Sequence, residues 1–189
     1  KRQDAHVAAI IDSFYPGARG GKAVAEAIFG DFSPSGKLPV TFYQGTENLP
    51  EFTDYDMSDR TYRYTDKNVL YPFGYGLHYG TIRYENAQIS CAQCSVRDAV
   101  DVSVDVINES SYTIHESVQA YIQHEEADAY EPGYQLKGIQ TVTLQPKETK
   151  RVTISLKARD FAIITQEGEC VVRPVSYTHL RAHETGRNL

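Results

Sequence analysis

The chain contains no tryptophan, one methionine, and no apolar run of the length needed to cross a membrane. A transmembrane helix needs about 18 or more consecutive apolar residues, so we expect no membrane partner. Basic residues are also in the minority, with 19 Lys+Arg against 25 Asp+Glu and a net charge of −6 over 189 residues. Because nucleic acids bind basic surface patches, we expect no nucleic-acid partner either.

Cysteine is scarce, with three residues, Cys91, Cys94 and Cys170. An odd number does not make a disulfide framework. The Cys91-x-x-Cys94 pair lacks the further ligands of a structural zinc site, and the strand expected after it does not suit a thioredoxin-like redox motif. We therefore interpret the cysteines as incidental thiols and expect no metal site.

Residues 1–43 have the pattern of the end of an α/β layer. Residues 7–14 are apolar apart from Asp12 and Ser13, and a Tyr-Pro-Gly turn follows them, which predicts a buried parallel strand. Apolar residues at helical spacing over 23–28 predict a short amphipathic helix that ends at Gly30. Residues 38–42 predict a second strand, so we expect a βαβ-like unit.

Residues 44–84 lack regular periodicity and are rich in tyrosine, proline and glycine. A long irregular stretch of this kind is typical of a functional loop or of a linker pressed against another surface. Tyrosine has a flat apolar face and a hydroxyl, which suit contacts with sugars and equally suit a hydrated seam between domains. We interpret this region as a connecting segment, with both roles open for its tyrosines.

From residue 85 to 174 the hydrophobic period changes to two, with turn residues between the alternating stretches. Alternation is seen over residues 100–106, 118–122 and 152–156, and Pro146-Lys147-Glu148 predicts a turn between two strands. Several short alternating strands predict an antiparallel β-sandwich. Residues 175–189 break this pattern and resemble peptides translated from sequencing-adapter DNA, so we predict a non-native, disordered tail.

Several ordered blocks resemble glycoside hydrolase family 3. Those of the second domain and of the connecting segment are Phe14-Tyr15-Pro16-Gly17-Ala18-Arg19-Gly20-Gly21, Pro34-Ser35-Gly36-Lys37-Leu38-Pro39-Val40-Thr41-Phe42, Asp59-Arg60-Thr61-Tyr62-Arg63-Tyr64 and Tyr71-Pro72-Phe73-Gly74-Tyr75-Gly76-Leu77-His78-Tyr79. Those of the third domain are Val104-Asp105-Val106-Ile107-Asn108, Val118-Gln119-Ala120-Tyr121-Ile122 and Gln135-Leu136-Lys137-Gly138. The resemblance departs at His78 and Gly80, where the family usually has Ser and Thr, and at Ile82, where it often has Phe.

The resemblance implies an α+β chain in two parts. A remnant of an α/β sandwich, residues 1–43, and the connecting segment, 44–84, are followed by an antiparallel fibronectin-III-like β-sandwich over 85–174, expected to lack its last strand. The implied activity is that of a retaining glycoside hydrolase releasing terminal β-linked glucose or xylose, with an oligosaccharide as substrate. The sequence around residues 49–55 leans towards β-xylosidases.

Retaining hydrolysis needs two carboxyl groups about 5 to 5.5 Å apart and no metal or organic cofactor. In the enzymes that the chain resembles, the nucleophilic Asp and the general acid Glu lie upstream of the matching blocks. We therefore assign no catalytic, substrate-binding or metal residue here, and expect no cofactor and no activity from the chain alone. The acidic residues Glu47, Asp54, Asp56 and Asp59 are interpreted as loop acids.

Two groups could support a site built elsewhere. Gly20-Gly21 could begin a helix whose free N–H groups face a cleft, or could be glycine because the turn is tightly packed. The Arg60-x-Tyr62-Arg63-Tyr64 stretch could reach a sugar or brace contacts between domains. A different class of function also stays open, that of a stand-alone fibronectin-III-like binding or adhesion module.

Overall fold

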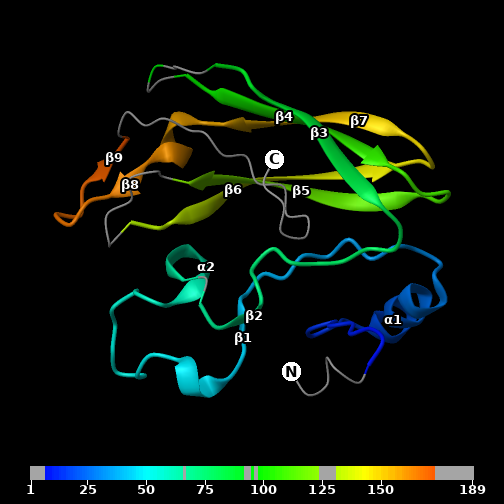
Figure 1. Ribbon diagram of the computed structural model, residues 1–189, viewed down its shortest axis with the longest axis horizontal. Helices are drawn as coiled ribbons and strands as arrows, with labels where there is room; N and C mark the ends of the chain where they lie inside the picture. The colour runs from blue at the N-terminus through cyan, green and yellow to red at the C-terminus, as the bar shows by residue number, and fades with distance from the viewer. Residues whose placement is uncertain (1–6, 66, 92–94, 96–97, 124–130, 173–189) are drawn as a thin grey trace.

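The computed structural model describes residues 7–65, 67–91, 95, 98–123 and 131–172 (Figure 1). A β-sandwich occupies one half of the molecule, and the N-terminal region with the connecting segment lies along one side of it. Among these residues, no helix is long and apolar enough to span a membrane. The predicted tail, residues 175–189, lies outside the described residues.

The sandwich consists of two antiparallel sheets. One has the order β3-β4-β7, made of Ile82–Ile89, Val100–Asn108 and Thr149–Leu156. The other pairs β5, Ile114–Gln123, with β6, Tyr134–Leu144. A 3-10 helix η2, Ala158–Phe161, and a short pair of strands, β8 (Ile163–Ile164) and β9 (Cys170–Val171), follow. The predicted fibronectin-III-like sandwich is confirmed.

Alternation along the strands builds the core between the sheets. Alternate residues of a strand face the same side of a sheet, and the register of β4 on β7 pairs Val104 with Val152 and Val102 with Ile154. The buried residues of the main core cluster come from both sheets: Ile82, Val106, Ile114, Val118, Leu144 and Val152. The predicted alternating stretches are therefore the elements that form this core.

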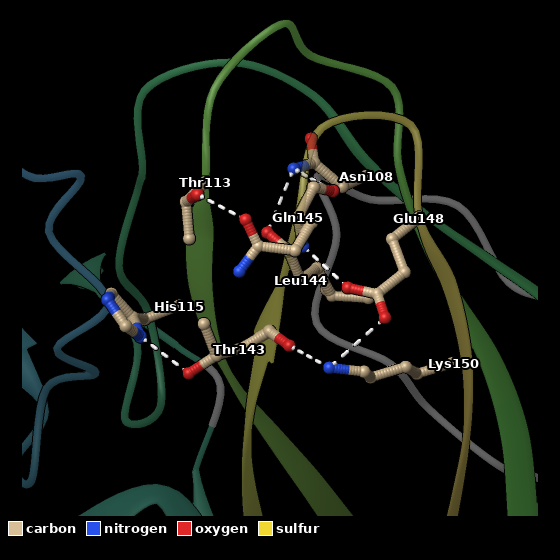
Figure 2. A network of polar contacts seen from close by, with 8 residues as sticks. All are labelled: Asn108, Thr113, His115, Thr143, Leu144, Gln145, Glu148 and Lys150. Carbon is tan, nitrogen blue, oxygen red and sulfur yellow. Dashed lines mark hydrogen bonds and ion pairs between the residues drawn. The ribbon is translucent and has the colours of Figure 1, made fainter.

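Asn108, which is 0% exposed, closes one end of the sandwich (Figure 2). Its side-chain amide nitrogen donates to the carbonyl oxygens of Tyr112, Leu144 and Gln145, at 2.8, 3.2 and 3.0 Å. Its side-chain oxygen accepts from the Ser110 N–H at 2.8 Å. One side chain thus ties the end of β4 both to the β4–β5 loop and to the turn between β6 and β7.

The turn between β6 and β7 agrees with its prediction. The Glu148 N–H donates to the Gln145 carbonyl at 3.0 Å, and Lys147 has a φ of 62°. The Glu148 carboxylate also accepts from the Gln145 N–H at 2.6 Å, and this hydrogen bond lowers the pKa of Glu148. The ionised carboxylate of Glu148 therefore stabilises this turn.

The predicted N-terminal helix is also confirmed, as α1, Gly20–Phe29. Gly30 follows it in the left-handed region, with a φ of 79°. There the Gly30 N–H donates to the Ala27 carbonyl and the Asp31 N–H to the Glu26 carbonyl, at 3.2 and 2.9 Å. Glycine is favoured at this position because a side chain would be strained there.

The prediction of a strand over residues 7–14 is wrong. Its apolar side chains are exposed, Val7 to 48% and Ile10 to 55%, and no strand of the described residues pairs with it. A strand needs neighbours for its backbone hydrogen bonds. An apolar run alone therefore does not form one here.

The predicted strand over residues 38–42 is wrong for most of its length. β1 is limited to Phe42–Tyr43 and pairs antiparallel with β2, Val69–Tyr71. Leu38 instead bonds to the connecting segment, because its N–H donates to the Tyr75 carbonyl and its carbonyl accepts from the Gly74 N–H, at 2.8 and 2.7 Å. The expected βαβ-like unit is thus replaced by docking against residues 69–76.

The connecting segment contains little regular structure, as predicted. Besides β2 it has a 3-10 helix η1, Thr46–Asn48, and one helical turn α2, Thr61–Tyr64, which lies beside β6 (Figure 1).

The interpretation of all three cysteines as incidental thiols is wrong for Cys91, which is disulfide-bonded. Cys94 lies outside the described residues, and Cys170 is a free, exposed thiol.

Candidate functional site at the seam between the connecting segment and the sandwich

Four aromatic rings bring the connecting segment onto the β5–β6 sheet. The Tyr62 ring stacks on Phe73 with ring centres 4.0 Å apart, and its edge contacts Tyr121 at 6.4 Å and Tyr134 at 5.3 Å. Tyr121 completes the group through Phe73 and Tyr134, at 6.5 and 5.8 Å. We call these four residues the aromatic seam. Such ring pairs stabilise a contact by about 0.5–1.5 kcal/mol beyond the area that they bury.

Two hydrogen bonds hold α2 against β6 and the residue that precedes it. The Leu136 N–H donates to the Tyr62 hydroxyl at 3.1 Å, and the Gly133 N–H donates to the Arg63 carbonyl at 2.7 Å. Both donors come from the sandwich and both acceptors from the connecting segment. The Tyr62 hydroxyl thus accepts a hydrogen bond from within the chain. This favours a role for Tyr62 in contacts between domains over contact with a sugar.

Tyr121 is the most buried ring of the seam, at 6% exposed. Burial raises the pKa of its hydroxyl well above the usual value of 10.0, with smaller contributions from Tyr62 and Tyr134. The neutral hydroxyl donates to the Gln119 side-chain oxygen at 3.0 Å. Tyr121 is thus a neutral hydrogen-bond donor under ordinary conditions, and it is not a proton carrier.

Gly74 allows the connecting segment to pass close over Tyr121. Its φ is 78°, and a Cβ placed there would lie 2.3 Å from the Tyr121 hydroxyl oxygen and 2.7 Å from the Gln119 side-chain oxygen. We expect G74A to lower the free energy of unfolding by about 1–3 kcal/mol, because the strained φ and the clash act together.

Thermal melting would measure the effect of G74A. The matched control is G21A, because a Cβ at Gly21 meets nothing within 4 Å and the residue lies inside α1. We expect G21A to raise the melting temperature slightly, since alanine favours a helix over glycine by about 1 kcal/mol. A G74A protein that melts with the wild type would contradict the prediction.

A small cavity of about 200 Å³ lies beside the aromatic seam and shares two of its rings, Tyr62 and Tyr134. It is lined by Thr41, Tyr62, Thr65, Val69, Pro72 and Tyr134. Hydroxyl groups are the polar groups of this lining, and no carboxylate takes part in it. The cavity therefore lacks the pair of carboxyl groups that glycoside hydrolysis requires.

A buried ion cluster forms a second contact between the sandwich and the residues that precede it. Glu116 of β5 lies 3.0 Å from the Lys37 ammonium and 3.7 Å from Nε2 of His78, and its side chain is 2% exposed. Lys37 and His78 come from residues that precede the sandwich. None of these three residues was predicted from the sequence to belong to a site.

The stretch around Arg60 braces a loop of the connecting segment. The Arg60 guanidinium donates to the carbonyl oxygens of Glu51, Asp54 and Asp56, at 2.9, 2.5 and 2.9 Å. All of its acceptors are backbone oxygens of one loop. This arrangement favours a bracing role over sugar contact for Arg60.

Gly20 and Gly21 differ in their surroundings. A Cβ at Gly20 would lie 2.3 Å from Cβ of Pro16, whereas one at Gly21 would meet nothing within 4 Å. Tight turn packing therefore accounts for Gly20, whose N–H donates to the Gly17 carbonyl at 2.8 Å. Packing gives no reason for glycine at Gly21.

The loop acids hold turns of the connecting segment. Asp54 accepts from the Asp56 N–H at 2.9 Å, and Asp56 accepts from the Ser58 N–H at 2.7 Å. Hydrogen bonds from the Ser58 side chain and backbone lower the pKa of Asp56. Asp56 is thus ionised at neutral pH and is unsuited to the role of a general acid, which needs a raised pKa.

Comparisons with known proteins agree with this architecture. Residues 1–79 match the glycosyl hydrolase family 3 C-terminal domain, and residues 116–182 match the fibronectin type III-like domain. The second match extends into the segment that we predicted to be non-native. Together the two matches define the class of protein, which is that of glycoside hydrolases with a fibronectin type III-like domain.

Within this class, the chain belongs to glycoside hydrolase family 3. A β-xylosidase of Formosa agariphila is 35% identical over 178 residues, which are 92% of this chain and 25% of that protein. A periplasmic β-glucosidase of Salmonella typhimurium is 33% identical over 167 residues, which are 82% of this chain and 22% of that protein. The chain thus spans about a quarter or less of the length of these relatives.

Solved structures give the same result. A β-glucosidase from Erythrobacter marinus is 37% identical with a TM-score of 0.71, over 86% of this chain and 22% of that one. A family 3 β-glucosidase from Bifidobacterium adolescentis is 30% identical with a TM-score of 0.72, over 85% of this chain and 26% of that one. The fold of this chain is thus a part of the fold of much larger enzymes.

Proposed function

We propose that the chain is the C-terminal part of a retaining glycoside hydrolase that releases terminal β-linked glucose or xylose from oligosaccharides. The observation that carries this proposal is the ordered match of both regions to family 3 relatives of which the chain covers 17–25%. Those relatives are named as β-xylosidases and β-glucosidases. The oligosaccharide would be bound by the domains that the chain does not include.

We also propose that the chain is inactive alone. Of the described carboxyl groups whose pKa departs clearly from its usual value, Asp56, Asp105 and Glu148, each has a lowered pKa because of hydrogen bonds. A general acid needs a raised pKa. The role that we propose for this chain is structural support of a site formed by other domains.

The contacts between the sandwich and the residues that precede it argue against the alternative of a stand-alone binding or adhesion module. In the sandwich, Tyr121 and Glu116 are buried at 6% and 1% exposed, and their partners lie largely in the residues that precede it. A module that acts alone has no need of such partners. We therefore propose one supporting unit with domain boundaries after residues 43 and 174. Because β3 begins at Ile82, we place the third boundary just before that residue, in place of the predicted boundary after residue 84.

The test is hydrolysis of p-nitrophenyl β-glucoside and p-nitrophenyl β-xyloside. The purified 189-residue chain would be compared with a longer protein that also includes the sequence encoded upstream in the same gene. We expect turnover from the longer protein alone, with a preference for the xyloside. Robust turnover by the chain itself would overturn the proposal, and preference for the glucoside would overturn the xylose assignment.

A further inference from the structure

Glu116 occupies a core position of the sandwich. It lies in β5 between Ile114 and Val118, and all three face the same side of the strand. Ile114 and Val118 belong to the main hydrophobic core and are 0% and 6% exposed, while Glu116 is 1% exposed. A carboxylate in such a row is costly to bury unless another group compensates its charge.

The compensating charge comes from outside the sandwich. The Lys37 ammonium lies 3.0 Å from Oε1 of Glu116 and also donates to the Gly76 carbonyl at 3.2 Å. The Lys37 side chain is itself 10% exposed. The ion pair is therefore largely withdrawn from water, and each charge depends on the other.

His78 places a second basic group beside the carboxylate. Its Nε2 lies 3.7 Å from Oε2 of Glu116, too far for a hydrogen bond. Oε2 of Glu116 and Nδ1 of His78 are both buried and have no hydrogen-bond partner among the described residues. Lys37 is thus the residue that satisfies the carboxylate directly.

The backbone around Lys37 is held so that its side chain reaches Glu116. A Cβ at Gly76 would lie 2.1 Å from the Gly36 carbonyl oxygen, so the two backbones touch. On the next residue, the Leu38 N–H donates to the Tyr75 carbonyl and the Gly74 N–H donates to the Leu38 carbonyl. These two hydrogen bonds form a local latch, and Lys37 extends from it to β5.

We propose that Glu116 is a docking receptor for Lys37, through which the sandwich recognises the region that precedes it. The interaction surface is the side of β5 at Glu116, and the partner it fits is a lysine presented on the irregular segment over residues 34–39. A buried ion pair adds little net stability, but it penalises any arrangement that leaves one charge buried alone. Glu116 therefore makes the docking specific for a cation at this point.

Hydrogen exchange on the full 189-residue chain tests the proposal. The amides of Leu38 and Gly74 report on the latch, and those of β4 and β7 report on the sandwich. We expect K37M to accelerate exchange at Leu38 and Gly74 by about tenfold or more, while β4 and β7 keep their protection, because local opening differs from global unfolding. We expect E116Q in the K37M background to restore much of the protection, because the uncompensated charge is then gone.

The difference in exchange between K37M and the double variant K37M/E116Q distinguishes docking by charge from simple packing. If Lys37 only fills space, K37M and the double variant K37M/E116Q would exchange alike, and the proposal would be wrong. Equal acceleration in β4 and β7 would also overturn it. If K37M does not fold, the single variant E116Q and the charge swap K37E/E116K decide, with protection of the latch expected in the swap and not in K37E.

The matched control is the exposed ion pair of Lys22 with Glu26. Their atoms lie 3.3 Å apart, but the side chains are 68% and 36% exposed. We expect K22M to leave exchange at Leu38 and Gly74 unchanged, because exposed ion pairs contribute little. K22M and K37M each remove one lysine charge, but only K37M, at the buried ion pair, would then accelerate exchange at Leu38 and Gly74.

Discussion

Replacing Tyr121 by alanine is expected to lower the free energy of unfolding by about 3–5 kcal/mol, the usual range for loss of a large buried aromatic side chain. The side chain is 6% exposed and its ring contacts Tyr62, Phe73 and Tyr134. Its removal opens a space in the middle of the aromatic seam, so the connecting segment loses its main apolar contact. Urea denaturation followed by far-UV circular dichroism would measure the change.

Two variants serve as controls for Y121A. Tyr55 is 90% exposed, so Y55A should change stability by less than about 0.5 kcal/mol. Y121F removes only the hydroxyl that donates to Gln119 and should cost about 0.5–1.5 kcal/mol. A Y121A protein within about 1 kcal/mol of the wild type would show that the seam contributes little.

Tyr121 also makes stability depend on alkaline pH. Its pKa in the folded chain lies above the usual value of 10.0 because of burial. In the unfolded chain the hydroxyl loses its proton at lower pH than in the folded chain, so its contribution to stability is present below pH 10.0 and is lost as the pH rises above it. Y121F should lack this part of the alkaline loss.

Sequence periodicity predicted the sandwich well because its strands carry their own signal. Residues 100–106 alternate in β4, and their neighbours on β7 alternate in step, so the pattern and the pairing agree. The same local rule failed over residues 7–14. An apolar run indicates burial, but a strand forms only where another strand offers hydrogen bonds.

The ion cluster could not be predicted because its parts are far apart in the sequence. In the sequence, Lys37 has the appearance of an ordinary surface lysine, and Glu116 that of a solvated charge on a strand. Only the fold brings the two to 3.0 Å. Tyr62 is an intermediate case, since the tyrosine-rich composition was compatible with a seam between domains and with sugar contacts, and did not identify which rings would stack.

The contacts between the sandwich and the residues that precede it fit the supporting role that we propose for this chain. This proposed role requires the parts of the chain to be held in fixed positions, and here the contacts gather on β5 and β6. Tyr121 and Glu116 both come from β5, and they receive partners from the connecting segment and from the N-terminal region. The sandwich is thus the base on which the preceding residues are ordered.

Asn108 gives the other large expected effect, because N108A removes four hydrogen bonds of a fully buried side chain, one of them buried and three part-buried. Its side chain makes hydrogen bonds to Tyr112, Leu144, Gln145 and Ser110, and the residue is 0% exposed. Each unsatisfied buried group costs about 1–3 kcal/mol, although the turn will relax and water will replace some partners. We expect a loss of about 3–5 kcal/mol, the range of exceptional single mutations, measured by urea denaturation.

The variant N108D tests the cause of this loss. It keeps the shape of the side chain but replaces a donor that faces three carbonyl oxygens with a charged acceptor. Burial and the facing carbonyls should raise the pKa of this Asp in the folded chain, so N108D should gain stability as the pH falls below neutral, because its protonated form can donate. As a control, N86A removes one exposed bond to Asp105 at 2.8 Å and places alanine at a φ of 52°, and together these changes should cost only about 1–2 kcal/mol. N108D as stable as the wild type at neutral pH would mean that the donor role of Asn108 does not hold this end of the sandwich together.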